Sequence, residues 1–193
     1  MTNLVCSDGR VLPLDVAGWL CDAAPEERRV LERAQGPVLD IGCGPGRHVL
    51  ALGDRGVLAL GVDVAEMAVQ LAHGRGALAL RRSVFERVPG AGRWATALLL
   101  DGNIGIGGDP VALLGRTAEL LQSRGRALVE VDAPGGVTAT VTARIDNGAV
   151  TSRWFRWSLV AADDVARIAV DSGFDVEDIW PQGERWFASL SAT

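Results

Sequence analysis

Three glycines follow a short apolar stretch in "VLDIGCGPGRH", residues 38–48. Gly42, Gly44 and Gly46 tolerate positive φ and let backbone N–H groups come close to a ligand. A helix that starts after such a turn also offers unpaired N–H groups. The segment therefore predicts a binding site for a nucleotide-like ligand at a turn between a strand and a helix.

The residues around these glycines favour a ligand other than a dinucleotide. A GxGxxG fingerprint would need a third glycine where the chain has Arg47. Asp40 stands in the strand before the glycines, where its charge would repel a pyrophosphate and stabilise an ammonium group. Asp63 follows about twenty residues beyond the first turn, where a carboxylate accepts hydrogen bonds from both ribose hydroxyls. The expected ligand joins a ribose to a cationic tail, as S-adenosylmethionine does.

The elements that must position these residues predict an α/β fold. Apolar strands without polar alternation, separated by helices, indicate a parallel sheet covered on both faces. Two final strands joined by the short loop "PQGE" predict a last strand that pairs antiparallel with the sheet. The strands are expected within residues 37–42, 57–63, 77–84, 95–102, 126–132, 174–180 and 185–192, and the helices from about Gly46 and over 65–74, 109–123 and 162–172.

Two segments lie outside this alternating pattern. Residues 14–34 are predicted to be helical, with Pro25 in the first turn of a helix, where its missing N–H is not needed. Residues 135–160 contain two alternating stretches around the turn "DNG", which predicts a β-hairpin. With 193 residues, the chain is expected to form one domain over 1–193, with an N-terminal helical cap at 1–36 and an inserted hairpin at 135–160.

The composition disfavours several classes of function. A net charge of -5 lacks the positive footprint of a nucleic-acid-binding protein. The chain has no lysine, which excludes Schiff-base chemistry and a Walker-type phosphate loop. Cys6, Cys21 and Cys43 form no metal-binding spacing, so neither a metal site nor a disulfide framework is expected. The apolar stretches are too short to span a bilayer and the N-terminus has no signal core, which predicts a cytoplasmic protein without membrane partners.

The motifs around the glycines and Asp63 resemble those of a known protein family. "VLDIGCGPG", with "ALGVD" downstream, is similar to the first two motifs of the class I S-adenosylmethionine-dependent methyltransferases, and the similarity extends in order and spacing over residues 38–132. It implies a Rossmann-like, doubly wound, seven-stranded and mostly parallel sheet with an antiparallel last strand. It also implies S-adenosylmethionine as the cofactor and an enzyme that transfers a methyl group.

The resemblance implies a role for residues at the carboxyl ends of the strands. Asp40 would act on the methionine amino group through water or backbone, and Asp63 would bind the ribose. Val64 or Met67 would cover one face of the adenine. Asp63 also fits an N-cap of the next helix, and Met67 fits a core position on that helix equally well. The expected cofactor contacts are Asp40, Gly42, Cys43, Gly44, Gly46, Asp63, Val64, Met67, Ser83, Val84, Phe85 and Asp101.

The chain departs from the family pattern after its third strand. Many members carry an acidic residue there that contacts the adenine amino group, whereas this chain has "RRSVFE", with Ser83 in that place. Val84 and Phe85 are expected to pack on the adenine ring. Residues 86–94 are short and contain proline and glycines, so the helix usual between the third and fourth strands is expected to be a loop.

The fourth strand ends in "LLLDGNIGIGGDP", where the family places its methyl acceptor. Asp101 and Asn103 are the candidate catalytic residues, because either can orient an amine or hydroxyl or take up its proton. Both are also turn formers, so a purely structural turn is the alternative. The prolines and aromatic residue of the DNA amino-methyltransferase motif are missing here, which disfavours a nucleic-acid base as acceptor.

Two other features have open alternatives. His48, one turn into the first helix of the sheet, is expected to cap a groove or to face solvent. In "RWFRW", Trp154 and Arg156 are expected on one side of the predicted hairpin and Phe155 and Trp157 on the other. One of the two sides is expected to be core and the other a wall of the acceptor pocket.

The sequence as a whole predicts a methyltransferase that acts on an oxygen or nitrogen of a small-molecule acceptor. The expected protein is a monomer or homodimer with no nucleic-acid partner. The alternative is a non-catalytic S-adenosylmethionine-binding sensor or partner subunit, which the unusual "DGNIGIGG" turn favours. A nucleotide-dependent oxidoreductase is opposed by Arg47 and Asp40.

Overall fold

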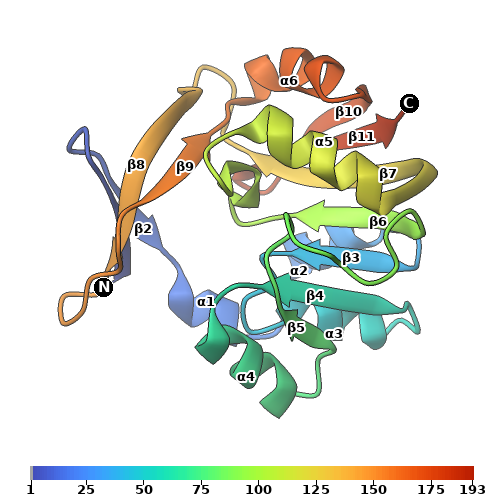
Figure 1. The fold of residues 1–193 in the computed structure, drawn as a ribbon, viewed down its shortest axis with the longest axis horizontal. Helices are drawn as coiled ribbons and strands as arrows, with labels where there is room; N and C mark the ends of the chain where they lie inside the picture. The colour runs from blue at the N-terminus through green and yellow to red at the C-terminus, as the bar shows by residue number, and fades with distance from the viewer. Residues whose placement is uncertain (1) are drawn as a thin grey trace.

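The computed structural model describes residues 2–193 and contains two β-sheets (Figure 1). The larger sheet has seven strands in the order β10-β11-β7-β6-β3-β4-β5, of which β11 runs antiparallel to both of its neighbours. This confirms the predicted Rossmann-like, mostly parallel sheet with an antiparallel last strand. The strands are β3 (Val38–Ile41), β4 (Ala59–Asp63), β5 (Ala79–Arg81), β6 (Trp94–Leu99), β7 (Leu121–Val131), β10 (Phe174–Gln182) and β11 (Arg185–Ala192).

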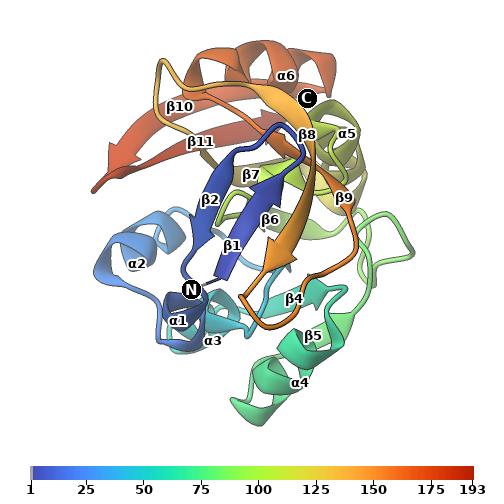
Figure 2. The same cartoon turned by 90° about the vertical axis from the view of Figure 1, so that its left-hand side faces the viewer.

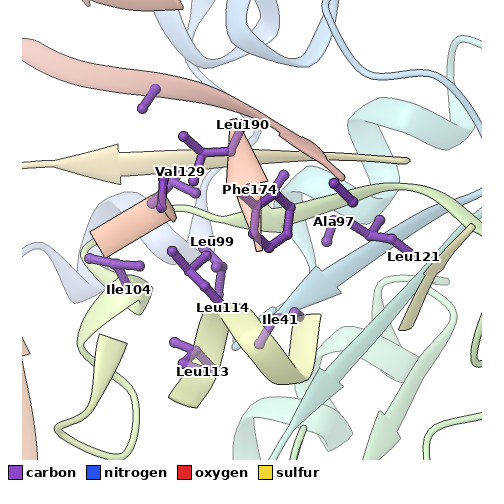
Figure 3. Close-up of a cluster of buried hydrophobic side chains, with 14 of the residues drawn as sticks. Ile41, Ala97, Leu99, Ile104, Leu113, Leu114, Leu121, Val129, Phe174 and Leu190 are labelled. Carbon is purple, nitrogen blue, oxygen red and sulfur yellow. The ribbon is translucent and has the colours of Figure 1, made fainter. Parts of the chain in front are cut away.

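Helices cover both faces of the larger sheet, which explains its apolar strands. Every residue of β6 is buried, because alternate side chains enter the two separate cores. One core joins Leu99 and Val129 to α5 and α6, as Figure 3 shows for part of it. The other joins Leu98 and Leu128 to α2, α3 and α4. These helices are α2 (Pro25–Leu31), α3 (Arg47–Gly53), α4 (Glu66–Gly74), α5 (Pro110–Leu120) and α6 (Val165–Asp171).

The connection from β5 to β6 has no helix, as the sequence predicted. Two short 3₁₀ helices lie elsewhere, η1 (Asn103–Gly105) after β6 and η2 (Ala162–Asp164) before α6. Among residues 2–193, no helix has the length and apolar character needed to cross a membrane.

The N-terminal segment differs from the predicted helical cap. It begins with two strands, β1 (Thr2–Cys6) and β2 (Val11–Leu14), and the expected helix over residues 14–34 is divided into α1 (Val16–Leu20) and α2. Pro25 does start α2, but Ala24 before it is extended at ψ 159°, since a residue that precedes proline avoids the helical region. The helix prediction was therefore correct near Pro25 and wrong for the residues between the two helices.

The predicted hairpin is present as β8 (Ala139–Asp146) and β9 (Phe155–Leu159). It joins the N-terminal strands in a four-stranded sheet of order β2-β1-β8-β9. Leu4 and Val141 are buried on its apolar face, with Phe155 and Trp157 packed beside them. Figures 1 and 2 show this second sheet beside the carboxyl ends of the parallel strands, the edge where ligands bind in this class of fold.

A close backbone contact attaches the second sheet to the turn after β6. A Cβ atom on Gly105 would overlap the carbonyl oxygen of Ser158 and would lie 2.6 Å from the ring nitrogen of Trp157. The Thr140 hydroxyl donates to the Gly108 carbonyl at 3.1 Å, and Ile106 forms an isolated β-bridge with Trp157. The glycine at position 105 therefore lets β9 lie directly on η1.

We expect Gly105→Ala to lower the free energy of unfolding by about 1–3 kcal/mol, the usual effect of inserting atoms into a closely packed site. Chemical denaturation followed by circular dichroism measures this change. Gly115→Ala in α5 is the matched control, because a Cβ there meets nothing within 4 Å, and alanine should stabilise the helix by about 0.5–1 kcal/mol. Equal stability of the two variants would contradict the packing role of Gly105.

Candidate functional site

The glycine turn after β3 uses its three glycines for different purposes. Gly42, Gly44 and Gly46 have φ values of 74°, 52° and 83°, all in the left-handed region. A Cβ on Gly42 would lie 2.5 Å from the Asn103 amide nitrogen, and one on Gly46 would lie 2.7 Å from the Cβ of Ala77. A Cβ on Gly44 would meet nothing within 4 Å. Two of the glycines therefore allow tight packing, and Gly44 faces open space that a ligand can use.

Asp63 at the end of β4 holds the glycine turn in place. Its Oδ2 accepts a hydrogen bond from the Gly44 N–H at 2.8 Å, and its Oδ1 accepts one from the Ala65 N–H at 2.8 Å. The second bond lies just before α4, whose N-cap is Ala65 without a side-chain cap, so Asp63 is not the N-cap that the alternative interpretation expected. Since each carboxylate oxygen accepts more than one hydrogen bond, both oxygens keep capacity for ribose hydroxyls.

Three apolar side chains are exposed at the carboxyl ends of β4 and β5. Val64, Met67 and Phe85 have exposed fractions of 66%, 68% and 48%. The high exposure of Met67 excludes the core position considered for it. Val84 is buried and belongs to the core, while the Ser83 hydroxyl accepts a hydrogen bond from the Phe85 N–H at 3.3 Å. The exposed set offers an apolar surface to a planar ring.

Asn103 contacts the glycine turn rather than open space. Its amide nitrogen donates to the carbonyl oxygens of Ile41 and Gly42 at 2.9 and 3.0 Å. The residue predicted to orient the acceptor is therefore a positioning residue for the turn. It also explains why position 42 has no room for a side chain.

Asp101 is paired with two guanidinium groups. Its carboxylate accepts hydrogen bonds from Arg47 at 2.7 and 2.8 Å and from Arg185 at 3.0 Å. Its own φ is 56°, in the left-handed region that non-glycine residues rarely adopt. Asp101 was predicted as a proton acceptor, but its carboxylate is already engaged by two guanidinium groups of the chain itself.

Glu27 in α2 and Glu130 in β7 complete this group of charges. Glu27 accepts hydrogen bonds from Arg47 at 2.6 Å and from Arg185 at 2.7 Å. Burial alone would raise the pKa of Glu27, but its contacts with His48, Arg47 and Arg185 outweigh burial and hold that pKa well below the ordinary value. Arg185 also donates to Glu130 at 2.7 Å through its Nε. We call Glu27, Arg47, Asp101, Glu130 and Arg185 the arginine network.

The sequence prediction missed most of this network. Arg47 was noted only as the residue that stands in place of a third glycine. The sequence contained one indication of Arg185 and Glu130. Each is a charged residue in a strand whose other residues near the carboxyl edge of the sheet are largely apolar.

His48 is buried next to the network and does not face solvent, contrary to expectation. Its Nδ1 lies 3.7 Å from Oδ2 of Asp40, and its Nε2 lies 3.6 Å from Oε1 of Glu27. Burial alone would lower the pKa of His48, but these two carboxylates outweigh burial and raise it to about 9. The cation nearest Asp40 therefore comes from the chain itself, which limits Asp40 to an indirect role toward any ligand ammonium.

A cavity of about 80 Å³ lies at the ends of β6 and β7, where the acceptor was expected. Its walls come from η1, from the end of β7 and from β9, and they include Glu130, Asp132 and Trp157. Of the predicted hairpin residues, Trp157 forms part of the cavity wall, whereas Trp154 precedes β9 and is half exposed. We call this space the β7–β9 cavity.

Solved structures with the same fold are S-adenosylmethionine-dependent methyltransferases. One from Bacteroides fragilis, in complex with S-adenosyl-L-homocysteine, is 22% identical, with a TM-score of 0.80 over 100% of this chain and 88% of that chain. The sugar N-methyltransferase KedS8 from Streptoalloteichus is 18% identical, with a TM-score of 0.64 over 88% of this chain and 87% of that chain. The chain therefore has the fold of this class.

A third structure is the 1,6-didemethyltoxoflavin-N1-methyltransferase of Burkholderia thailandensis, 20% identical with a TM-score of 0.60 over 81% of this chain and 70% of that chain. No family model and no curated protein sequence matches the chain. At identities this low, the similarity establishes the fold, and the resemblance predicted from the glycine turn and Asp63 is confirmed at that level.

The environment of His48 predicts a pH dependence of stability. A pKa raised from 6.5 to about 9 on folding adds stability that is complete below pH 6.5 and is lost as the pH rises toward 9. We expect the free energy of unfolding to fall between about pH 6.5 and 8.5, below the range in which most thiols ionise. Denaturant titrations across this range measure the slope.

His48→Gln should flatten that slope, because the titrating group is gone. His73→Gln is the matched control, since His73 is exposed and contacts only the Ala79 carbonyl, so it should keep the wild-type slope. Parallel curves for the wild type and His48→Gln would show that His48 does not change its proton occupancy on folding.

Proposed function

We propose that this protein is an S-adenosylmethionine-dependent methyltransferase that transfers a methyl group to an oxygen or nitrogen of a small molecule. The observation that carries the proposal is the contact between Asp63 and the Gly44 N–H. It fixes an unobstructed glycine beside a carboxylate that still has hydrogen-bonding capacity, at the carboxyl edge of a doubly wound sheet.

The residues around this contact fit the three parts of the cofactor. The backbone at Gly44 would lie along the methionine part, Asp63 would accept hydrogen bonds from the ribose, and Val64, Met67 and Phe85 would cover the adenine. Gly42, Cys43 and Gly46 shape the turn by packing. S-adenosylmethionine supplies an activated methyl group, so the protein has mainly to align the acceptor, which is worth about 7–11 kcal/mol.

The residues of this chain supply that alignment. Asn103 and Asp63 hold the glycine turn from two sides, and the second sheet stands beside the carboxyl edge. Arg47 and Arg185 donate hydrogen bonds to the Asp101 carboxylate, so Asp101 serves to position the turn after β6. A strong general base is not required for transfer from an activated methyl group.

Two lines of support come from outside the site. The Bacteroides fragilis structure contains S-adenosyl-L-homocysteine, and the names of two other similar structures specify a toxoflavin precursor and a sugar as the molecules methylated. The net charge of -5 also favours a small-molecule acceptor over a nucleic acid.

A non-catalytic S-adenosylmethionine-binding protein is the second candidate, because both predicted catalytic residues are engaged with the chain itself. Turnover separates the two candidates. Release of S-adenosylhomocysteine in the presence of an acceptor supports the enzyme, and tight binding without release from any acceptor class supports the sensor.

Calorimetric titration with S-adenosylmethionine, S-adenosylhomocysteine and NAD tests the cofactor directly. We expect binding of the first two and none of NAD. Asp63→Ala should weaken binding by roughly 10 to 150-fold, because a hydrogen bond to a charged group is worth about 1.5–3 kcal/mol.

Asp63→Asn keeps the shape of the side chain and one acceptor oxygen, so it distinguishes lost contacts from a disordered turn. Asp54→Ala is the matched control, as Asp54 is exposed at the end of α3 and away from the glycine turn. Wild-type affinity in a folded Asp63→Ala variant would remove Asp63 from the site, and absence of adenosyl-ligand binding to the wild type would overturn the proposed function.

A further inference from the structure

We propose that the methyl acceptor is an amine whose nitrogen binds in the β7–β9 cavity, and that Asp132 is the carboxylate that binds it and takes its proton. This inference rests on the proposed function and narrows the acceptor to one chemical class.

The position of the cavity suits an acceptor. Gly102 and Ile104 of its wall flank Asn103, whose side chain contacts Gly42 of the glycine turn. The cavity and the glycine turn therefore share a boundary at η1. A volume of about 80 Å³ exceeds the roughly 30 Å³ that one water molecule occupies in the liquid, so it accommodates a small functional group rather than a whole large molecule.

The charge that faces the cavity belongs mainly to Asp132. Glu130 also lines the cavity, but its oxygens accept hydrogen bonds from Arg185 and from the Asp101 N–H. Within residues 2–193, the Asp132 carboxylate has no hydrogen bond and no ion pair. Glu130 is compensated by the chain, whereas the charge of Asp132 is available to a ligand.

The backbone of Asp132 is held firmly although its side chain is free. Its N–H donates to the Val160 carbonyl at 2.8 Å, and its carbonyl accepts from the Ala162 N–H at 2.9 Å. Asp132 is exposed to solvent, and desolvation at the cavity wall together with the charge of Glu130 raises the pKa of its carboxyl. A carboxylate held in a fixed position beside a bound amine can accept its proton.

Trp157 adds an aromatic wall to the same cavity. Its ring is packed edge-on against Phe155, with the ring centroids 6.0 Å apart and the planes at 79°. The faces of aromatic rings attract cations, and a neighbouring carboxylate strengthens that preference. A carboxylate acceptor would be repelled by Asp132, and a neutral hydroxyl can only donate a hydrogen bond to it, whereas an ammonium group is also attracted by its charge.

With these groups, the protons and electron pairs of the methyl transfer are all accounted for. The amine binds as an ammonium ion and loses one proton to Asp132 or water, which frees its electron pair. The nitrogen then forms a bond to the methyl carbon as the bond from that carbon to sulfur breaks, and the electron pair of the broken bond stays on sulfur as a neutral thioether. When the amine is primary or secondary, the proton remaining on the methylated nitrogen goes to solvent.

The test uses the full chain and acceptors that share a carbon skeleton. Benzylamine, benzyl alcohol and benzoate form one set, and glucosamine and glucose form a second. Production of S-adenosylhomocysteine measures turnover, and saturation-transfer NMR on protein saturated with S-adenosylhomocysteine measures acceptor binding. We expect binding and methylation of an amine, without turnover of the matching alcohol or acid.

Asp132→Asn should lower kcat/KM for the amine by about 100-fold or more, the usual contribution of a positioned acid or base. It should also remove the acidic limb of the pH profile of kcat/KM and leave S-adenosylmethionine affinity unchanged. The charged groups around Asp132 are Glu130, with its partner Arg185, and Asp163, whose carboxylate accepts from the Gly135 N–H. Asp163→Asn is the matched control and should keep wild-type kcat/KM.

The other outcomes contradict either the inference alone or the proposed function itself. Binding of S-adenosylmethionine with methylation of an alcohol or acid, or with an Asp132→Asn variant that matches the wild type, overturns the inference and leaves the methyltransferase in place. Binding of S-adenosylmethionine with neither amine binding nor amine turnover overturns the inference as well. Failure to bind S-adenosylmethionine overturns the proposed function itself.

Discussion

Arg185 connects parts of the chain that are far apart in sequence, and the site depends on that connection. From β11 it reaches Glu27 in α2, Asp101 after β6 and Glu130 in β7. The Arg47–Glu27 pair of the same network is buried, and removal of one partner from such a pair costs about 3–5 kcal/mol, because the other charge is left uncompensated. The positions of these elements are therefore coupled, and the left-handed backbone at Asp101 is tolerated because two guanidinium groups hold its side chain.

The same network controls the glycine turn through Arg47, the first residue of α3. Arg47 directly follows Gly46, so its pairing with Glu27 fixes the start of the helix just beyond the turn. Asp63 and Asn103 hold the turn from the side of β4 and of η1. A turn supported in this way needs little reorganisation when a ligand binds.

Local patterns predicted the sheet and the turn well, because those features depend on neighbouring residues. The uninterrupted burial of β6 and the spacing from the glycines to Asp63 are readable from short stretches. The N-terminal strands were missed although they form a local hairpin, in which β1 pairs with β2 across the turn "SDGR", and only the pairing of β1 with β8, with Leu4 opposite Ile145, lacks a local signal. The arginine network was missed because nothing near Asp101 in the sequence shows that two arginines will contact it.

The carboxylates at the carboxyl ends of the strands differ in the groups that balance their negative charge. This difference distinguishes the carboxylates that stabilise the fold from those that can bind a ligand. Glu27, Asp101 and Glu130 are paired with arginines, and Asp40 lies beside a buried His48. These groups are balanced by the chain, so a ligand adds little to them. Asp63 is bound to two backbone N–H groups, while the Asp132 carboxylate has no partner among the described residues. Since a cavity wall that carries an uncompensated charge attracts its opposite, the cofactor and acceptor sites are expected where the chain leaves its acids unpaired.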